Sequence, residues 1–466
     1  MTCHTPHPRP RLLSITWPIF SEHLLHASVG MLFVWLTAQI SDSTAAAFGL
    51  SNQIMTFFII LFRLVGVGAS VVITQYLGGG DREGAERIAR ASLAAGLLLG
   101  VISAAVIWLG ADSLLALLKL PEDLRPEAKP YLLLLGAALI FDSLNATMAS
   151  VLRANTFTRD TLLLIVAMYI SSLVIGLPFM YGWFGFPNLG LVGIGIGFVA
   201  SRAIAQVLYL WLWRRRLGIR PHIEDWWKIR IESLREMMHI GLPGAGENIA
   251  YRLSFTANLA IVAGFGATAL ATHTYILQIS YFVLLCGLAI GFGTEIVVGH
   301  LIGAGQLHDA NRLVRKSLRF GIAGAFCVAG IVALCGKSIL GAFSSDPQVI
   351  LGGAKILLIL VLLEPGRTFN LVVINALRAT GDARFPVMFG VFSMFFVSVG
   401  LAWLLGVHFG LGLIGVWLGF ASDEWVRGIA MYVRWQRKAW VPHARKTRRR
   451  IIKQRVETFP EPAEAT

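Results

Sequence analysis

Long stretches without a single charged side chain are the feature that most constrains this chain. Residues 161–187, 253–294 and 385–422 contain no Lys, Arg, Asp or Glu. A helix needs about 20 apolar residues to cross the hydrocarbon core of a bilayer, so the two longer stretches each hold about two crossings. Only 14% of the 466 residues are charged, against about 25% in soluble domains. The pattern predicts an all-α integral membrane protein. It excludes a soluble enzyme, a disordered chain, a disulfide scaffold and an outer-membrane barrel.

The positions of the basic residues predict the orientation in the membrane. The formal net charge is +14, and most Lys and Arg outside the apolar stretches fall in alternate loops, chiefly 214–235 and the chain after Arg434. Basic loops stay in the cytoplasm. We therefore expect a multi-pass protein of the cytoplasmic (inner) membrane with both termini cytoplasmic. The basic segment 446–455 is expected to lie near anionic lipid headgroups, with RNA binding as the weaker alternative, so the bilayer is a predicted partner and nucleic acid is not.

The sequence contains two related copies of one pattern. At an offset of 225 residues Pro18 matches Pro243, Glu22 matches Glu247, and Leu-Arg-Ala at 152–154 matches Leu-Arg-Ala at 377–379. A second block, GLVGIGIGF at 190–198, matches GLIGVWLGF at 412–420 at an offset of 222. A constant offset over so many positions indicates an internal duplication.

Each copy is predicted to hold six of twelve transmembrane helices. We place them near 13–40, 45–77, 92–118, 131–153, 161–187 and 189–213 in the first copy, and near 239–264, 269–302, 318–343, 350–378, 385–407 and 411–435 in the second. Because six is even, both halves enter the membrane in the same direction, which is the parallel-repeat arrangement with a cavity between two pseudo-symmetric six-helix bundles. The predicted domains are a cytoplasmic N-terminus (1–12), an N-lobe (13–213), a cytoplasmic linker (214–238), a C-lobe (239–438) and a basic cytoplasmic tail (439–466). The linker contains Trp226-Trp227 and basic residues, which predict a helix lying at the membrane interface; a plain tether is the alternative.

Glu247 is the first candidate for binding a coupling cation. It lies one turn after Pro243, and Glu247, Tyr251, Ser254 and Asn258 share one face of an otherwise apolar helix. A polar stripe facing lipid is costly, so we expect these residues to line the cavity. With no cation evident beside it, the carboxyl can exchange a proton near neutral pH or bind Na⁺ with neighbouring oxygens.

The first copy offers a weaker version of the same site. Glu22 is the repeat mate of Glu247 and has His26 one turn later and Phe33 beyond, so we include Glu22 among the cation-coupling candidates. His26 and Phe33, together with the repeat mates Asn145 and Asn370, are expected to line the substrate cleft. A buried, hydrogen-bonded carboxyl is the structural alternative for both glutamates.

Four further charged residues occupy equivalent positions with opposite signs. Asp142 matches Arg367 at the first offset, and Arg202 matches Glu424 at the second. We interpret them chiefly as interhelical ion pairs, either across the axis or within a lobe, since charges in hydrocarbon usually have a partner. No metal site is predicted from the histidines. The sequence also has no Asp-Asp-x-x-Asp cluster, no His-Glu-x-x-His motif and no nucleophile elbow, so an enzyme is not expected.

The combined landmarks resemble the MATE family, the multidrug and toxic compound extrusion transporters, and look most like its bacterial branch. The resemblance spans about residues 13–438 and rests on four segments: GLP-x-x-x-E at 241–247, IVVGHLIGAG at 296–305, EPGRTFNLVVINALRATGDARFPV at 364–387 and GLGLIGVWLGFASDEWVRG at 410–428. It implies two six-helix lobes around a V-shaped cleft, and a monomer that exports small lipophilic organic cations in exchange for H⁺ or Na⁺ without a cofactor. Many members carry a first-helix aspartate where this chain has Phe33, and some place the seventh-helix acid where it has Tyr251.

Two other functions remain open at this point. A flippase for a lipid-linked precursor shares the duplicated architecture, but it needs a cationic cavity in which Arg202, Arg252, Arg367 and Arg427 are unpaired. A membrane-embedded transferase is the more distant alternative. The partner of each buried arginine therefore separates an exporter of cations from a flippase.

Overall fold

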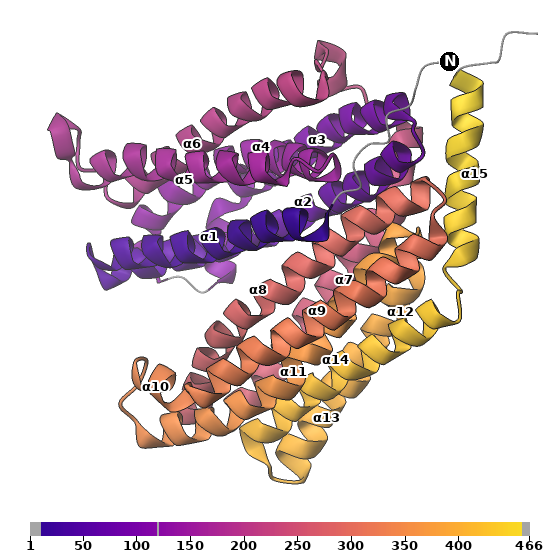
Figure 1. The fold of residues 1–466 in the computed structure, drawn as a ribbon. Coiled ribbons are helices and arrows are strands. Elements are labelled where there is room, and N and C mark those ends of the chain that lie inside the picture. The colour runs from indigo at the N-terminus through magenta and orange to yellow at the C-terminus, as the bar shows by residue number, and fades with distance from the viewer. Residues whose placement is uncertain (1–10, 119–120, 459–466) are drawn as a thin grey trace, which may run out of the picture. The chain divides into compact units, whose positions relative to one another are not determined.

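The computed structural model describes residues 11–118 and 121–458, and within these residues every regular element is helical (Figure 1). The first half forms α1 (Leu12–Ala38), α2 (Asp42–Gly78), α3 (Arg82–Leu117), α4 (Arg125–Ala154), α5 (Thr158–Tyr181) and α6 (Leu191–Leu212). The second half forms α7 (Ile231–Ala263), α8 (Ala267–Gly303), α9 (Leu307–Leu334), α10 (Gly336–Gly341), α11 (Pro347–Ala379), a continuous helical segment at Arg384–His408 that includes α12 (Arg384–Ser393) and α13 (Gly400–Trp403), and α14 (Gly412–Gln436). The basic tail forms α15 (Val441–Thr458).

Ten of the described helical segments are long and apolar enough to cross a membrane. The two remaining long helices, α7 and α14, have the right length but carry ionisable residues near their centres: Glu247 and Arg252 on α7, and Asp423, Glu424 and Arg427 on α14. Charged side chains at such depth need partners inside the protein. We therefore expect the ionisable residues of these two helices to form ion pairs or hydrogen bonds inside the protein.

Most predicted spans agree with the helix ends to within eight residues, and two do not. The third predicted span began at 92, whereas α3 begins at Arg82; the ninth was placed at 318–343, whereas α9 covers Leu307–Leu334. Both helices begin with amphipathic turns rich in arginine, which apolarity alone does not detect. The linker 214–238 does not form the single interface helix that was predicted: it holds a π-helical end to α6 at Trp213–Leu217, one 3-10 turn at Ile223–Trp226 and the first turns of α7 from Ile231.

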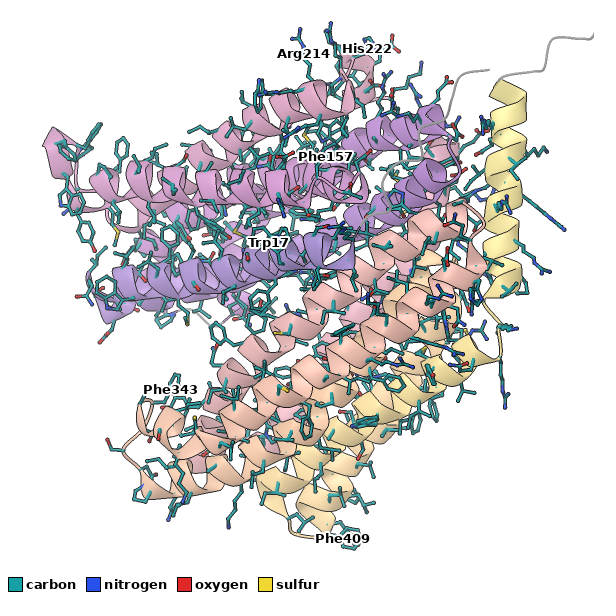
Figure 2. All side chains as sticks on the ribbon, viewed as in Figure 1. Trp17, Phe157, Arg214, His222, Phe343 and Phe409 are labelled. Carbon is teal, nitrogen blue, oxygen red and sulfur yellow. The ribbon has the colours of Figure 1, made fainter. Side chains whose placement is uncertain are left out.

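The helices group into two units. Unit 1 comprises Met1–Phe20, Thr74–Asp81 and Gly246–Thr466, and unit 2 comprises Ser21–Ile73 and Arg82–Ala245. The units differ from the two halves of the repeat because the first turns of α1 and the end of α2 pack with the second half. In unit 1, Phe343 after α10 and Phe409 before α14 lie at the end opposite α15 (Figures 1 and 2).

Glycines permit the closest helix contacts in both repeats. A Cβ added to Gly193 on α6 would lie 2.5 Å from the backbone nitrogen of Met180 on α5. Its repeat mate Gly415 on α14 stands equally close, with 2.5 Å between the added Cβ and the nitrogen of Gly406. The repeated block that contains these glycines thus encodes one helix contact twice. Small residues at such positions let helix backbones approach within the membrane.

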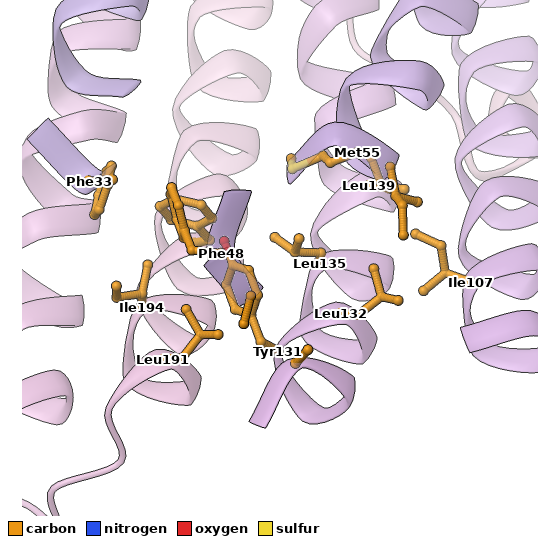
Figure 3. Close-up of a cluster of buried hydrophobic side chains, with 14 of the residues drawn as sticks. Phe33, Phe48, Met55, Ile107, Tyr131, Leu132, Leu135, Leu139, Leu191 and Ile194 are labelled. Carbon is orange, nitrogen blue, oxygen red and sulfur yellow. The ribbon is translucent and has the colours of Figure 1, made fainter. Parts of the chain in front are cut away.

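The core of unit 2 is a cluster of aromatic and aliphatic side chains drawn from most of its helices. Figure 3 shows part of it, with Phe33 of α1, Phe48 of α2, Tyr131 of α4 and Leu191 of α6. The ring centroids of Phe33 and Phe198 are 4.8 Å apart in an edge-to-face arrangement, which is a favoured geometry for aromatic pairs. Phe33 is therefore a core residue of this unit.

Candidate functional site

Glu247 lies against an arginine. The side chain of Glu247, on α7 within unit 1, is buried and forms an ion pair with Nη2 of Arg378, in the last turn of α11. Nη1 of Arg378 also donates to Oδ1 of Asn375 at 3.4 Å. The expectation that no cation lies beside Glu247 is therefore wrong. The partner lies 131 residues away along the chain, too far for local spacing to indicate it.

The first repeat builds the same contact from equivalent residues. In unit 2, Nη1 of Arg153 donates to Oε1 of Glu22 at 2.8 Å, and Nη2 donates to Oγ of Ser150 at 3.1 Å. Each of these residues is 225 positions before its counterpart in Glu247, Arg378 and Asn375. We call each Glu–Arg pair a clasp. It ties the first helix of a repeat to the end of the fourth, so each glutamate belongs to a pair that the duplication preserved.

The polar stripe on α7 divides into a buried and an exposed part. Ser254 and Asn258 are buried in unit 1: Oγ of Ser254 donates to the carbonyl oxygen of Met394 at 2.9 Å, and Nδ2 of Asn258 contacts Oγ of Ser398 at 3.2 Å. Both residues tie α7 to the helical segment 384–408. Tyr251 instead is 46% exposed. Of this stripe, only Tyr251 has the exposed position predicted for a residue lining a cleft.

The remaining predicted cleft residues are also placed differently from one another. His26 is exposed on α1, and its Nδ1 contacts the hydroxyl of Tyr169 on α5. Phe33 is buried in the core of unit 2. Asn145 and Asn370 are buried too, and Nδ2 of Asn145 donates to the carbonyl oxygen of Arg202 at 3.0 Å. Burial of Phe33 and of both asparagines differs from the prediction that they line an open cleft.

Asp142 and Arg202 form an ion pair between α4 and α6 inside unit 2. Nε of Arg202 donates to Oδ2 of Asp142 at 2.8 Å, and its guanidinium carbon lies 4.6 Å from the centre of the Phe198 ring. The guanidinium also donates to the carbonyl oxygen of Phe198 at 3.2 Å. The salt bridge, the face of the Phe198 ring and the carbonyl oxygen together stabilise the buried charge of Arg202. The pair therefore connects α4 and α6 within one unit.

The equivalent positions in unit 1 form a larger network with the signs exchanged. Nε of Arg367 on α11 lies 3.4 Å from Oε1 of Glu424 on α14, and its Nη1 lies 2.8 Å from Oε1 of Glu364. Oγ of Ser280 donates to the same Glu364 oxygen at 2.6 Å, and Nδ2 of Asn370 donates to Glu424 at 3.0 Å. Arg367 thus carries two acidic partners where Asp142 has one basic partner.

A second arginine extends this network along α14. Nη2 of Arg427 lies 2.8 Å from Oδ2 of Asp423 and 3.0 Å from Oε1 of Glu424. Oγ of Ser393 donates to the other oxygen of Asp423 at 2.6 Å. All of these groups are buried. No site was predicted at Glu364, Asp423 or Arg427, although the i+3 and i+4 spacing of acid and arginine at 364/367 and 423/427 was an available signal.

Comparison with known proteins agrees with this architecture. The family profile MatE matches twice, at residues 18–181 and 243–404, and the two starting points are again 225 residues apart. The chain is 35% identical over 430 residues to the uncharacterized transporter YisQ of Bacillus subtilis, covering 92% of this chain and 94% of that one. It is 24% identical to the probable multidrug resistance protein NorM of Thermotoga maritima, with 96% of each covered. In structure it is similar to a mutant of the Vibrio cholerae MATE transporter VcmN, with a TM-score of 0.83, 21% identity, and 92% and 96% of the two chains covered.

Proposed function

The chain belongs to the MatE family of transporters, and we propose that it exports amphipathic, mostly cationic organic compounds in exchange for H⁺ or Na⁺. It is a multi-pass, all-helical membrane transporter and not an enzyme. The buried charges of the two units support both the chemical class of the substrate and the coupling to an ion.

The excess of acid in unit 1 is the observation that carries this proposal. Its helices α7, α8, α11 and α14 bury more carboxylates than arginines: the acids are Glu247, Glu295, Glu364, Asp423 and Glu424, and the arginines paired with them are Arg367, Arg378 and Arg427. A buried cluster with an excess of negative charge is costly unless a cation neutralises it. Proton or Na⁺ uptake supplies that cation.

A flippase would need four unpaired arginines in its cavity, and three of these four form ion pairs. Arg202 contacts Asp142, Arg367 contacts Glu364 and Glu424, and Arg427 contacts Asp423 and Glu424, each within its own unit. Arg252 is exposed on α7. Arginines already neutralised by carboxylates offer little attraction to a pyrophosphate. The pairing therefore favours a cationic substrate over an anionic one.

Tyr251 is the residue for which we propose direct contact with the substrate. Its ring is exposed on α7, stacks on Phe255 with 6.4 Å between ring centroids, and lies one turn from Glu247. The face of an aromatic ring attracts organic cations. Alternating access would then expose this part of α7 first to the cytoplasm and next to the outside.

Dye efflux from everted membrane vesicles under separate proton and sodium gradients tests the proposal. We expect one of the two gradients to drive accumulation of a lipophilic cationic dye, because cation binding at the acidic cluster is exchanged for substrate. An anionic lipid-pyrophosphate analogue should not compete with the dye. Dye movement that neither gradient affects would contradict ion coupling, and competition by the analogue would favour the flippase.

Glu247→Gln tests the residue on which the coupling depends. The variant keeps the shape of the side chain but removes its charge, so substrate-driven movement of the coupling ion should be lost while the protein still inserts. Reconstituted vesicles with a pH-sensitive or Na⁺-sensitive dye inside provide the measurement. Glu127→Gln is the matched control, because Glu127 accepts a hydrogen bond from Thr44 at 2.6 Å outside the acidic cluster. Ion movement by Glu247→Gln at the wild-type rate would reject the role.

A further inference from the structure

Glu295 is a buried acid that none of the ion pairs above uses. It lies on α8 in unit 1, is 4% exposed, and within the described residues its Oε2 has no hydrogen-bond partner. Buried carboxyl oxygens without a partner are rare in proteins and call for a physical reason, such as a bound ion or proton. Glu295 therefore needs an explanation that the fold alone does not give.

The helix contact between α8 and α11 places Glu295 beside the clasp of the second repeat. A Cβ added to Gly291 on α8 would lie 2.8 Å from Nδ2 of Asn375 on α11. Glu295 follows Gly291 by one turn, and Arg378 follows Asn375 by one turn. This register brings the guanidinium of Arg378 close enough to act electrostatically on Glu295. Nε of Arg378 also has no hydrogen-bond partner within the described residues, so this guanidinium has spare capacity for a second acid.

The first repeat shows what the fold itself requires at this position. The contact of α2 with α4 is the same, with 2.8 Å between an added Cβ on Gly66 and Oγ of Ser150. The residue that corresponds to Glu295, however, is Ser70. The clasp of Glu22 and Arg153 thus forms with a small neutral residue beside it. The carboxyl of Glu295 is present only in the second repeat, and the helix packing forms without it in the first repeat.

We propose that Glu295 is the second carboxylate of the cation-coupling site, so that Glu247, Arg378 and Glu295 together hold one exchangeable monovalent cation, H⁺ or Na⁺. Two carboxylates against one guanidinium leave one negative charge in a buried place, and a single cation neutralises it. Arg378 pairs with one acid while the cation occupies the other. This inference rests on the proposed ion coupling and assigns it to the second repeat.

The contacts that α1 and α9 make with α8 near Glu295 come from uncharged side chains. The start of α1 contacts α8 through Thr16, whose Oγ1 would lie 2.6 Å from a Cβ on Gly293, and residues 12–20 contain no ionisable side chain. On the side of α9, Oγ1 of Thr294 donates to Oγ of Ser317 at 2.9 Å. The charge balance at the site therefore depends on Glu247, Arg378 and Glu295, whereas Arg427 is paired with Asp423 and Glu424.

Cation-dependent thermal stability of the purified transporter tests this assignment. The wild type should gain stability on addition of NaCl relative to KCl at equal ionic strength if Na⁺ is the cation, or shift its unfolding midpoint between acidic and alkaline pH if the cation is H⁺. Glu295→Gln and Glu295→Ser, the latter restoring the residue of the first repeat, should lose this dependence. Ser70→Ala is the matched control and should retain it. Unchanged cation dependence in both Glu295 variants would overturn the proposal.

Labelling of the wild-type protein keeps the test independent of how well the variants fold. A hydrophobic carbodiimide modifies protonated carboxyl groups in apolar surroundings, and peptide mass spectrometry identifies the modified residue. We expect modification of Glu295 that decreases when Na⁺ is added or when the pH is raised. Modification of Glu247 without any at Glu295 would contradict the shared site. If wild-type transport responds to neither ion gradient, the proposed function fails; if it responds and Glu295→Gln is still fully coupled, only this inference fails.

Discussion

Single buried residues in this transporter are tied to partners that the duplication either copied or inverted. The clasps copy their signs, with an acid on the first helix and an arginine at the end of the fourth helix of each repeat. The pairs Asp142–Arg202 and Arg367–Glu424 exchange their signs instead. At the positions of Asp142–Arg202 and Arg367–Glu424 the fold therefore requires an acid paired with a base, but either helix can carry the acid. We therefore expect that both charges of such a pair can be removed together.

Removing one member of the Asp142–Arg202 pair should destabilise the protein more than removing both. Arg202→Met leaves Asp142 as an unpaired, largely buried charge, which costs up to about 3–5 kcal/mol, whereas replacing a whole buried pair with apolar residues of similar volume is often neutral. We expect the double variant Asp142→Leu/Arg202→Met to recover most of the loss. Thermal unfolding of the purified protein, followed by circular dichroism, measures the difference. Equal stability of Arg202→Met and the wild type would contradict the role of the pair.

The sequence identified these residues but not their partners. Equivalent positions followed from the constant offset, and burial followed from the apolar surroundings. The partner of Glu247 depends instead on which ends of α7 and α11 meet, and periodicity along one helix does not contain that information. A usable signal was present, because Glu22 and Arg153 recur together as Glu247 and Arg378 at the same offset. Joint recurrence of an acid and a base indicates a contact better than either residue alone.

At the scale of helices, the length of the apolar stretches was enough to predict most spans. The error in the linker arose because hydrogen bonds and ion pairs in a turn determine its structure. The linker was predicted as an interface helix from its Trp and Arg content. Its chain instead folds around the buried carboxylate of Asp225, whose Oδ2 accepts from the backbone nitrogen of His222 at 2.9 Å. Arg90 and Arg230 also lie 4.0 Å and 3.5 Å from this carboxylate. The hydrogen bond and ion pairs of Asp225 stabilise this turn more than the weak helical propensity of the short linker stabilises a helix.

The glycines between adjacent helices should tolerate no added methyl group. Gly415→Ala would place a Cβ 2.5 Å from the backbone of the helical segment 384–408, and overpacking of this kind costs about 1–3 kcal/mol. We expect a lower unfolding midpoint and a smaller folded fraction on size-exclusion chromatography. Gly324→Ala is the matched control, because no atom in the described part of the chain lies within 4 Å of an added Cβ on that residue of α9. A Gly415→Ala protein as stable as Gly324→Ala would contradict the close contact.

At the scale of the whole molecule, the distribution of basic residues predicts which ends of the helices face the cytoplasm. Unit 1 places the basic helix α15 at one end, and Phe343 and Phe409 at the other (Figures 1 and 2). On α15 the exposed positions include Arg445, Lys446, Arg449 and Lys453, whereas Ala444 and Ile451 are buried against unit 1. Because such basic segments stay inside the cell, we expect Phe343 and Phe409 to lie on the outer side.

Cysteine labelling in intact cells checks this orientation. In a background without native cysteines, Phe343→Cys and Phe409→Cys should react with a membrane-impermeant maleimide added from outside, because both side chains are exposed. His222→Cys and Arg449→Cys, which are exposed in basic segments, should react only after the cells are permeabilised. Proton or sodium entry drives export only if the acidic cluster loads from the side of Phe343. Labelling of His222→Cys in intact cells would invert the topology, and the same cation gradient would then drive uptake of the substrate instead of its export.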